Sequence, residues 1–185
     1  TFLTLSSIAF GTMFGWIFTG IGDANWREMI DLAARLGGGH VTIQHAEYLE
    51  SPTLSRSVEG TDWLRELAAS DEEVDRVVTG ISGILMLASA GRNQGAGFFA
   101  FDDAAEDAST LSLLEALAEG ELPHAEGKGG IALGAKLAEN LRVGVGNKVV
   151  YTVTDKEGEI VQEAVRVAGL LRTGAPSVDA RLSLL

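Results

Sequence analysis

Hydrophobic and polar residues are divided unevenly along the chain. The first 22 residues hold no charged side chain, whereas all 26 acidic and all 14 basic residues follow Gly22. As a helix rising about 1.5 Å per residue, such a segment is roughly 33 Å long, enough to cross a hydrocarbon core of about 30 Å. The pattern therefore predicts one membrane-spanning helix followed by a water-soluble domain.

A buried core helix or an uncleaved signal sequence would give a similar pattern. The apolar stretch of a signal peptide is normally shorter, follows a basic start and precedes an Ala-x-Ala cleavage site. This segment has neither the basic start nor the cleavage site, and it does not begin with Met. We therefore expect a retained membrane helix in a chain with further residues upstream.

Small residues recur at every fourth position of this segment, at Ser7, Gly11, Gly15 and Thr19. In a helix they form one stripe, hereafter the small-residue stripe, along which a neighbouring backbone can approach closely. We expect this stripe to pack against another transmembrane helix. The alternative that stays open is that glycine and serine are simply frequent in membrane helices.

The polar residues that follow keep the spacing of a helix. Residues 23–36 place Trp26, Ile30, Leu32, Ala33 and Leu36 at helical intervals, and the glycines 37–39 then end the helix. This divides the chain into a transmembrane helix with a stalk, 1–36, and a soluble domain, 37–185. The second part has the size of one ordinary domain or of part of a larger one.

Patterns within the soluble domain predict both strands and helices. Alternation and short apolar runs indicate strands at 40–44, 74–78, 84–88, 98–101 and 130–134. Helical spacing indicates helices at 61–69, 109–120 and 135–141, the first with Trp63, Leu64 and Leu67 facing inward. A long hairpin, 149–154 with 159–171, surrounds a turn that ends at Gly158. The predicted fold class is α+β with a mixed sheet.

Charge and cysteine content narrow the class of protein. A formal net charge of −12 argues against a nucleic-acid surface and against a polybasic lipid-binding patch, and it suits basic partners. The chain has no cysteine, so it forms neither disulfides nor thiolate metal sites.

A glycine motif resembles a dinucleotide-binding fingerprint. Residues 95–100 read Gly-Ala-Gly-Phe-Phe-Ala, but the fingerprint needs a helix N-terminus directly after the glycines to hold the pyrophosphate. A strand-like stretch follows instead. We therefore expect no cofactor here.

The remaining candidate residues are better explained as solvated side chains than as catalytic residues or metal ligands. His40 and His45 are five apart in strand-like sequence and would point to opposite faces, while His124 stands alone in a loop. The acidic run 102–107 lacks the spacing of a calcium loop. No Ser or Cys sits in a nucleophile motif, so we expect no catalytic residue, cofactor or metal site.

Three blocks of sequence, in this order after the apolar span, carry a resemblance to a known family. They are ARLGGGHVTI at 34–43, GIALG at 130–134 and LRVGVGNKV at 141–149. In these blocks the chain resembles the FtsX-like ABC transporter permeases with a MacB-like periplasmic core domain, the nearest branch being the lipoprotein-releasing permeases of the LolC and LolE type. The resemblance extends over nearly the whole chain.

The resemblance implies a non-catalytic permease subunit that works by mechanotransmission. In such transporters a cytoplasmic ATP-binding subunit hydrolyses ATP, and stalks carry the motion of the membrane helices to the periplasmic domains. The implied partners are this ATPase, a second permease subunit in a homo- or heterodimer, and a periplasmic carrier or adaptor protein. The implied location is the bacterial inner membrane with the soluble domain in the periplasm, and the favoured cargo is lipoprotein or another lipophilic molecule.

The family pattern also has three more membrane helices after the periplasmic domain. Because this sequence stops at Leu185, we expect a fragment or a truncated member, with three further apolar spans beyond that residue. Two other classes of function remain as alternatives. One is a membrane-anchored periplasmic interaction module without transport activity, and the other, less favoured, is a tethered hydrolase.

Overall fold

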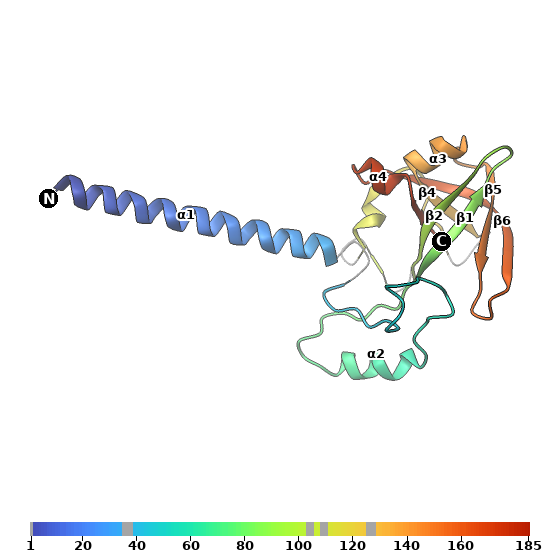
Figure 1. The fold of residues 1–185 in the computed structure, drawn as a ribbon, viewed down its shortest axis with the longest axis horizontal. Coiled ribbons are helices and arrows are strands. Elements are labelled where there is room, and N and C mark those ends of the chain that lie inside the picture. The colour runs from blue at the N-terminus through green and yellow to red at the C-terminus, as the bar shows by residue number, and fades with distance from the viewer. Residues whose placement is uncertain (1, 35–38, 103–105, 108–110, 125–128) are drawn as a thin grey trace.

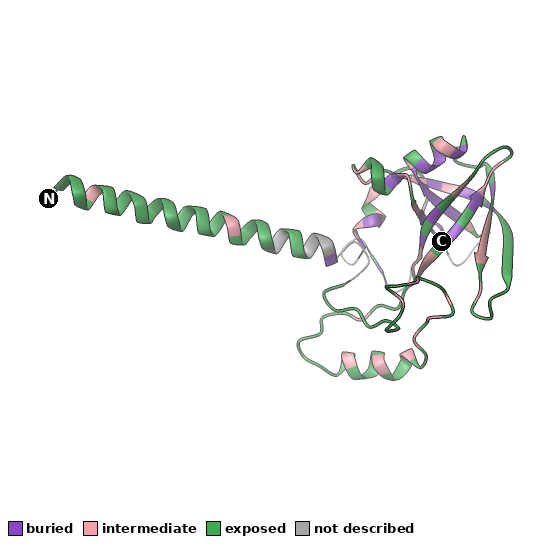
Figure 2. Ribbon diagram, in the orientation of Figure 1, coloured by how far each residue is buried: buried purple, intermediate pink, exposed green. Residues whose placement is uncertain are grey.

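A computed structural model describes residues 2–34, 39–102, 106–107, 111–124 and 129–185. Figure 1 shows one long helix, α1 (Phe2–Ala33), that projects away from a domain built around a sheet. The side chains of α1 are exposed along nearly all of its described length, as Figure 2 shows. The helix predicted from the apolar segment is therefore present, and it continues into the polar residues that follow.

Gly39, one of the three glycines predicted to end the helix, has the conformation of a residue that follows a helix end. The N–H of Gly39 donates a hydrogen bond to the carbonyl of Ala34 at 2.9 Å, and Gly39 has a φ of 60°. This left-handed conformation is one that glycine adopts at helix ends with little cost. The last predicted stalk residues, 35 and 36, lie outside the described residues.

A loop region with one short helix connects α1 to the sheet. The helix α2 (Thr61–Ala69) has the predicted bounds, and Gly60 precedes it with a φ of 68°. The prediction that its apolar side chains face inward was wrong for Trp63 and Leu67, which are exposed, while Leu64 is half-buried. The pattern identified an amphipathic helix correctly, but the described chain covers its apolar face only in part.

The sheet contains seven strands and closes on itself. The strands are β1 (Ile81–Ala88), β2 (Asn93–Ala100), β3 (Leu117–Gly120), β4 (Gly130–Gly134), β5 (Lys148–Thr154), β6 (Ile160–Leu171) and β7 (Leu182–Leu184). Their order is β3-β6-β4-β7-β2-β1-β5, and β5 also pairs with β6. Six strands therefore form a ring, and β3 is added to the second half of β6, where Leu117 pairs with Leu171.

Both parallel and antiparallel pairs occur, as predicted for a mixed sheet. β4 runs parallel to β6, and β7 runs parallel to β2 but antiparallel to β4. The predicted hairpin of β5 and β6 is confirmed, with Gly158 at a φ of 89° and the Asp155 carboxylate accepting the N–H of Glu159 at 2.8 Å. The α+β fold class is confirmed as well.

Several predicted elements of the domain are wrong. Residues 40–44 and 74–78 form no strand, because neither has a strand beside it to complete a ladder. The helix predicted at 109–120 is replaced by a 3₁₀ helix, η2 (Ser112–Ala116), followed directly by β3. Ser109, the predicted cap, lies outside the described residues. The leucines of this stretch pack in the smaller of two hydrophobic clusters of the sheet from a 3₁₀ helix, whose turns are tighter than those of an α-helix.

Alternation along the strands separates two hydrophobic clusters on the two faces of the sheet. Ile131 and Leu133 of β4 belong to the larger cluster, whereas Ala132 between them belongs to the smaller one. The helix α3 (Ala135–Leu141) buries Leu137 and Leu141 in the larger cluster, and η2 buries Leu113 in the smaller one. A short helix, α4 (Pro176–Asp179), precedes β7.

Candidate functional site

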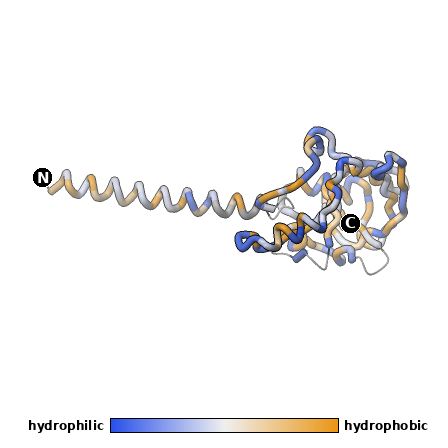
Figure 3. Tube along the Cα trace, turned by 90° about the horizontal axis from the view of Figure 1, so that it is seen from below, coloured by the Kyte–Doolittle hydropathy of each residue, from blue (hydrophilic) through white to orange (hydrophobic). Residues whose placement is uncertain are grey.

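The first candidate site is the apolar part of α1. Residues Phe2–Trp26 are long and apolar enough to cross a membrane by length and composition, and this stretch is not buried within the protein. Figure 3 shows hydrophobic positions recurring along the helix where it projects from the domain. A helix with large exposed apolar side chains, such as Phe10, Trp16 and Phe18, needs lipid or other helices around it.

The small-residue stripe lies on the exposed surface of this helix. A β-carbon added to Gly11 or Gly15 would meet no atom within 4 Å, so the backbone is open to a neighbour there. The hydroxyl of Ser7 donates to the carbonyl of Leu3 at 2.6 Å, and that of Thr19 donates to the carbonyl of Gly15 at 2.9 Å. Because these hydroxyls are bonded within the helix, they can lie in apolar surroundings. The packing role of the stripe stays a prediction.

The glycine motif at 95–100 lies within a strand. The whole of β2 pairs with β1, from Asn93 opposite Ala88 to Ala100 opposite Ile81. No helix begins after Gly97, whose N–H donates instead to the carbonyl of Arg181 at 2.7 Å. The structure thus lacks the helix terminus that a dinucleotide-binding fingerprint requires.

Neither His40 nor His45 lies in a strand, contrary to the interpretation from the sequence. His45 lies at a turn, where its Nδ1 accepts the N–H of Glu47 at 3.3 Å, and His40 lies in an exposed bend. Among the residues that the structure describes, no three His, Asp or Glu side chains gather in a way that could hold a metal ion.

The acidic run retains one buried carboxyl in its described part. Glu106 is almost fully buried, and one of its oxygens, Oε2, has no hydrogen-bond partner. Loss of hydration, and secondarily the charge of Asp102, raise the pKa of this carboxyl. Asp107 forms an ion pair with Arg76 at 3.1 Å, so the run contacts the loop before β1.

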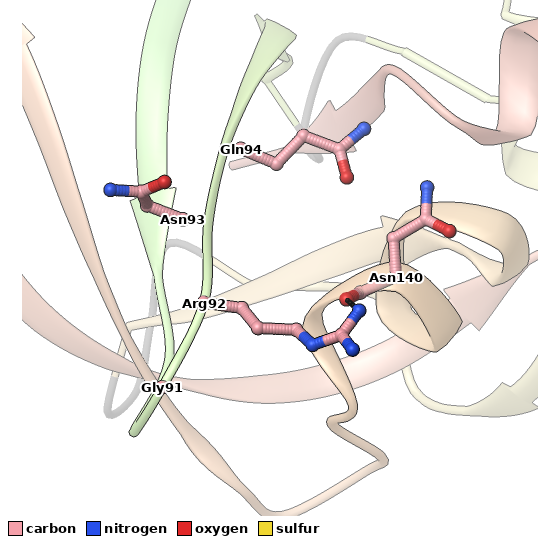
Figure 4. Close-up of a pocket in the computed structure, with 5 residues that line it drawn as sticks. All are labelled: Gly91, Arg92, Asn93, Gln94 and Asn140. Carbon is pink, nitrogen blue, oxygen red and sulfur yellow. Dashed lines mark hydrogen bonds between the residues drawn. The ribbon is translucent and has the colours of Figure 1, made fainter.

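A shallow polar depression lies between the β1–β2 turn and the end of α3 (Figure 4). Arg92 donates from Nη1 to the carbonyl of Asn140 at 3.0 Å, and the Ser89 hydroxyl donates to the carbonyl of Leu141 at 2.7 Å. These are carbonyls that the last turn of a helix leaves without partners, and a cation there also interacts favourably with the helix dipole. These two hydrogen bonds therefore connect the β1–β2 turn to the C-terminal end of α3.

Sequence reasoning missed these hydrogen bonds because the bonded residues are about fifty positions apart, and no local pattern connects them. It did identify the segment that α3 belongs to. β4 and α3 have the predicted bounds, and Arg142 then takes a φ of 56° while the N–H of Val143 bonds the carbonyl of Ala138. This arrangement is a Schellman motif with arginine where glycine is usual.

The turn after α3 is equally well defined. The Asn147 side chain accepts the N–H of Gly144 at 2.8 Å, and the N–H of Gly146 donates to the carbonyl of Val167 in β6. The segment 130–149, which carries part of the family resemblance, thus contains β4, α3 and the start of β5, and it buries Ile131, Leu133, Leu137, Leu141 and Val149, while the turn 142–148 stays at the surface.

Comparison with known proteins agrees with the MacB-like part of this resemblance and does not address the lipoprotein-releasing branch. A family model described as MacB-like periplasmic core domain matches residues 1–182 of the chain. No curated protein matches the chain.

Proposed function

Because the chain belongs to the MacB-like periplasmic core domain family, which is of the ABC transporter permease type, we propose that it is a permease subunit that works by mechanotransmission. The main support for this proposal is that the family model matches α1 and the sheet domain together. A long helix, apolar in its first part and polar in its second, leads directly into the family's core domain. Such a helix suits the transfer of motion from a membrane to a soluble domain.

We further propose the division of the chain into a transmembrane helix with a stalk, 1–36, and a periplasmic core domain, 37–185. The ATP is hydrolysed by a separate cytoplasmic subunit, and this chain is non-catalytic. A second permease subunit would pack against the small-residue stripe. The proposed cargo is lipoprotein or another lipophilic molecule leaving the outer leaflet of the inner membrane.

Reconstitution with an ATPase tests the transport proposal. The complete permease, including any residues that follow Leu185, would be co-expressed with the ATPase encoded beside it, purified in lipid nanodiscs, and assayed for ATP hydrolysis and for release of an acylated lipoprotein. Transport predicts a stable complex and ATP-dependent release, which an ATPase variant lacking its Walker A lysine should abolish. A stable complex without release of cargo would favour the interaction module, and failure to form any complex would contradict the permease proposal.

Labelling of single cysteines tests the proposed location. The chain has no cysteine of its own, so each introduced thiol is unique. Glu157 is exposed in the β5–β6 turn, and Phe2 is exposed at the far end of α1. In intact spheroplasts an impermeant thiol reagent should label Glu157→Cys, whereas Phe2→Cys should react only after lysis. The reverse pattern would place the domain in the cytoplasm.

A further inference from the structure

The helix α2 presents an apolar face that the described parts of the chain leave open. None of its residues is buried, and Trp63 and Leu67, one turn apart, are 59% and 61% exposed. Leu64 and Ala68, on the adjacent side, are half-buried. The helix thus leaves Trp63 and Leu67 to solvent and covers Leu64 and Ala68 only in part.

An open groove lies beside this face, and Leu67 belongs to both. The apolar lining of the groove consists of Ile43 and, from the segment 64–74, of Leu64, Leu67, Ala68 and Val74, whereas Trp63 lies next to the lining residues in sequence. The acidic residues 71–73 lie along the same groove. A floor of aliphatic side chains with a charged rim is the arrangement that accepts an amphipathic helix.

The exposed tryptophan lies beside Gly60. A β-carbon added at Gly60 would lie 3.2 Å from the Trp63 Cδ1 and Nε1 atoms, so the glycine leaves room for the indole ring. Tryptophan is among the residues that most often dominate binding energy at protein interfaces.

The charge around the groove is predominantly negative. Residues 59–75 include the acids Glu59, Asp62, Glu66, Asp71, Glu72, Glu73 and Asp75, and the single base Arg65. Within the described part of the chain, the carboxylates of Glu66, Glu72 and Glu73 have no hydrogen bond or ion pair, and these residues are exposed. The rim therefore offers free negative charge to whatever enters the groove.

We propose that this groove binds a basic amphipathic segment of a partner protein, with its apolar side chains on Trp63 and Leu67 and its lysines or arginines against Glu72 and Glu73. A second copy of this acidic face would meet like charge, and so would an anionic membrane. The inference deepens the proposed function, since it assigns the surface by which the permease meets a soluble partner. Binding to the groove is nevertheless measured separately from transport.

A pair of designed peptides tests the proposal. The probe is a fluorescein-labelled helix with leucine at i, i+3, i+4 and i+7 and lysine elsewhere, and its counterpart has glutamate in place of lysine. The full chain in phosphatidylcholine nanodiscs is titrated by fluorescence anisotropy, with empty nanodiscs as the background. We expect the lysine peptide to bind at least about tenfold more tightly than the glutamate peptide.

Matched variants locate the binding. Trp63→Ser with Leu67→Ser should weaken the lysine peptide by at least about tenfold, since two central apolar contacts are lost. Ile84→Ser with Met86→Ser, which alters an equally exposed apolar pair on β1, should leave the affinity unchanged. Because all four side chains are exposed, the variants should keep the wild-type circular dichroism spectrum.

The charge of the rim is tested in the same assay. Glu72→Lys with Glu73→Lys should weaken the lysine peptide and strengthen the glutamate peptide. Equal binding of the two peptides, or an equal loss from the β1 pair, would overturn the proposal. So would concentration-dependent self-association in sedimentation that Trp63→Ser abolishes, since a second copy would then occupy the groove.

Discussion

Shortening Leu133 to alanine should destabilise the sheet domain by about 3 kcal/mol. Leu133 is fully buried in β4, where it pairs with Leu170 of β6 on one side and with Ser183 of β7 on the other. Its side chain belongs to the larger hydrophobic cluster, which α3 closes with Leu137. Removing a buried leucine side chain beyond its β-carbon costs about 2–5 kcal/mol, and the position between two paired strands leaves little room for the cavity to collapse.

The loss can be measured on the full chain by pulse proteolysis in increasing urea. The chain is held in detergent, and a brief exposure to protease digests only molecules whose sheet domain is unfolded. With a dependence of about 2 kcal/mol per molar urea, a loss of 3 kcal/mol lowers the midpoint by roughly 1.5 M. The tryptophans, at positions 16, 26 and 63, lie outside both hydrophobic clusters, so their fluorescence would report poorly on this transition.

Ile84→Ala is the matched control, because Ile84 is a β1 residue that is 62% exposed. Its midpoint should correspond to a loss below about 1 kcal/mol. A shift of the Leu133→Ala midpoint as small as that of the control would mean that β4 does not lie in the core. The proposed closed arrangement of the strands would then be wrong.

Three further results are expected. Replacing both glycines of the small-residue stripe by leucine should abolish assembly with the partner subunits while expression persists, whereas Phe14→Leu should be nearly silent, as measured by co-purification at equal membrane abundance. Arg142→Gly should raise the free energy of unfolding by up to about 1 kcal/mol, and Arg142→Ala should not, because Arg142 has a positive φ that only glycine adopts freely. The hydrogen bond from Tyr151 to Glu163, together with partial burial and the charge of Glu163, raises the pKa of this phenol to about 12, so absorbance titration of Glu163→Ala should show a pKa shifted back towards 10, the ordinary value for tyrosine. Since the folded pKa is raised, the stabilising effect of this contact is present below about pH 10 and is lost as the pH rises towards 12.

The parts of the fold that sequence predicted are those whose signals are local. The run Gly-Ile-Ala-Leu-Gly at 130–134 is too short and too apolar for a surface helix, and the glycines bound it, so β4 could be placed to the residue. The β5–β6 hairpin depends on a turn whose Asp155 and Gly158 occupy the positions that such turns favour. Each of these elements is specified by residues within a few positions of one another.

The parts that failed depend on partners distant in sequence. Residues 40–44 alternate as a strand does, but no other strand lies beside them. Conversely, Leu-Ser-Leu at 182–184 is too short to predict a strand. It forms β7 only because β2 and β4 lie on either side of it, with Phe98 and Leu133 both opposite Ser183. For α2, the pattern reveals which residues form an apolar face, but it does not reveal whether the same chain covers that face.

The position of β7 affects how the domain can be made. It is the last described strand to be synthesised, yet it lies in the middle of the sheet, between β2 and β4. At about 5–20 residues per second, the residues between β2 and β7 take on the order of ten seconds to translate. During that interval β2, and β4 once it has been synthesised, have unpaired edges that can join other chains. The nascent domain therefore needs a chaperone or another means of shielding these edges until residue 184 has emerged.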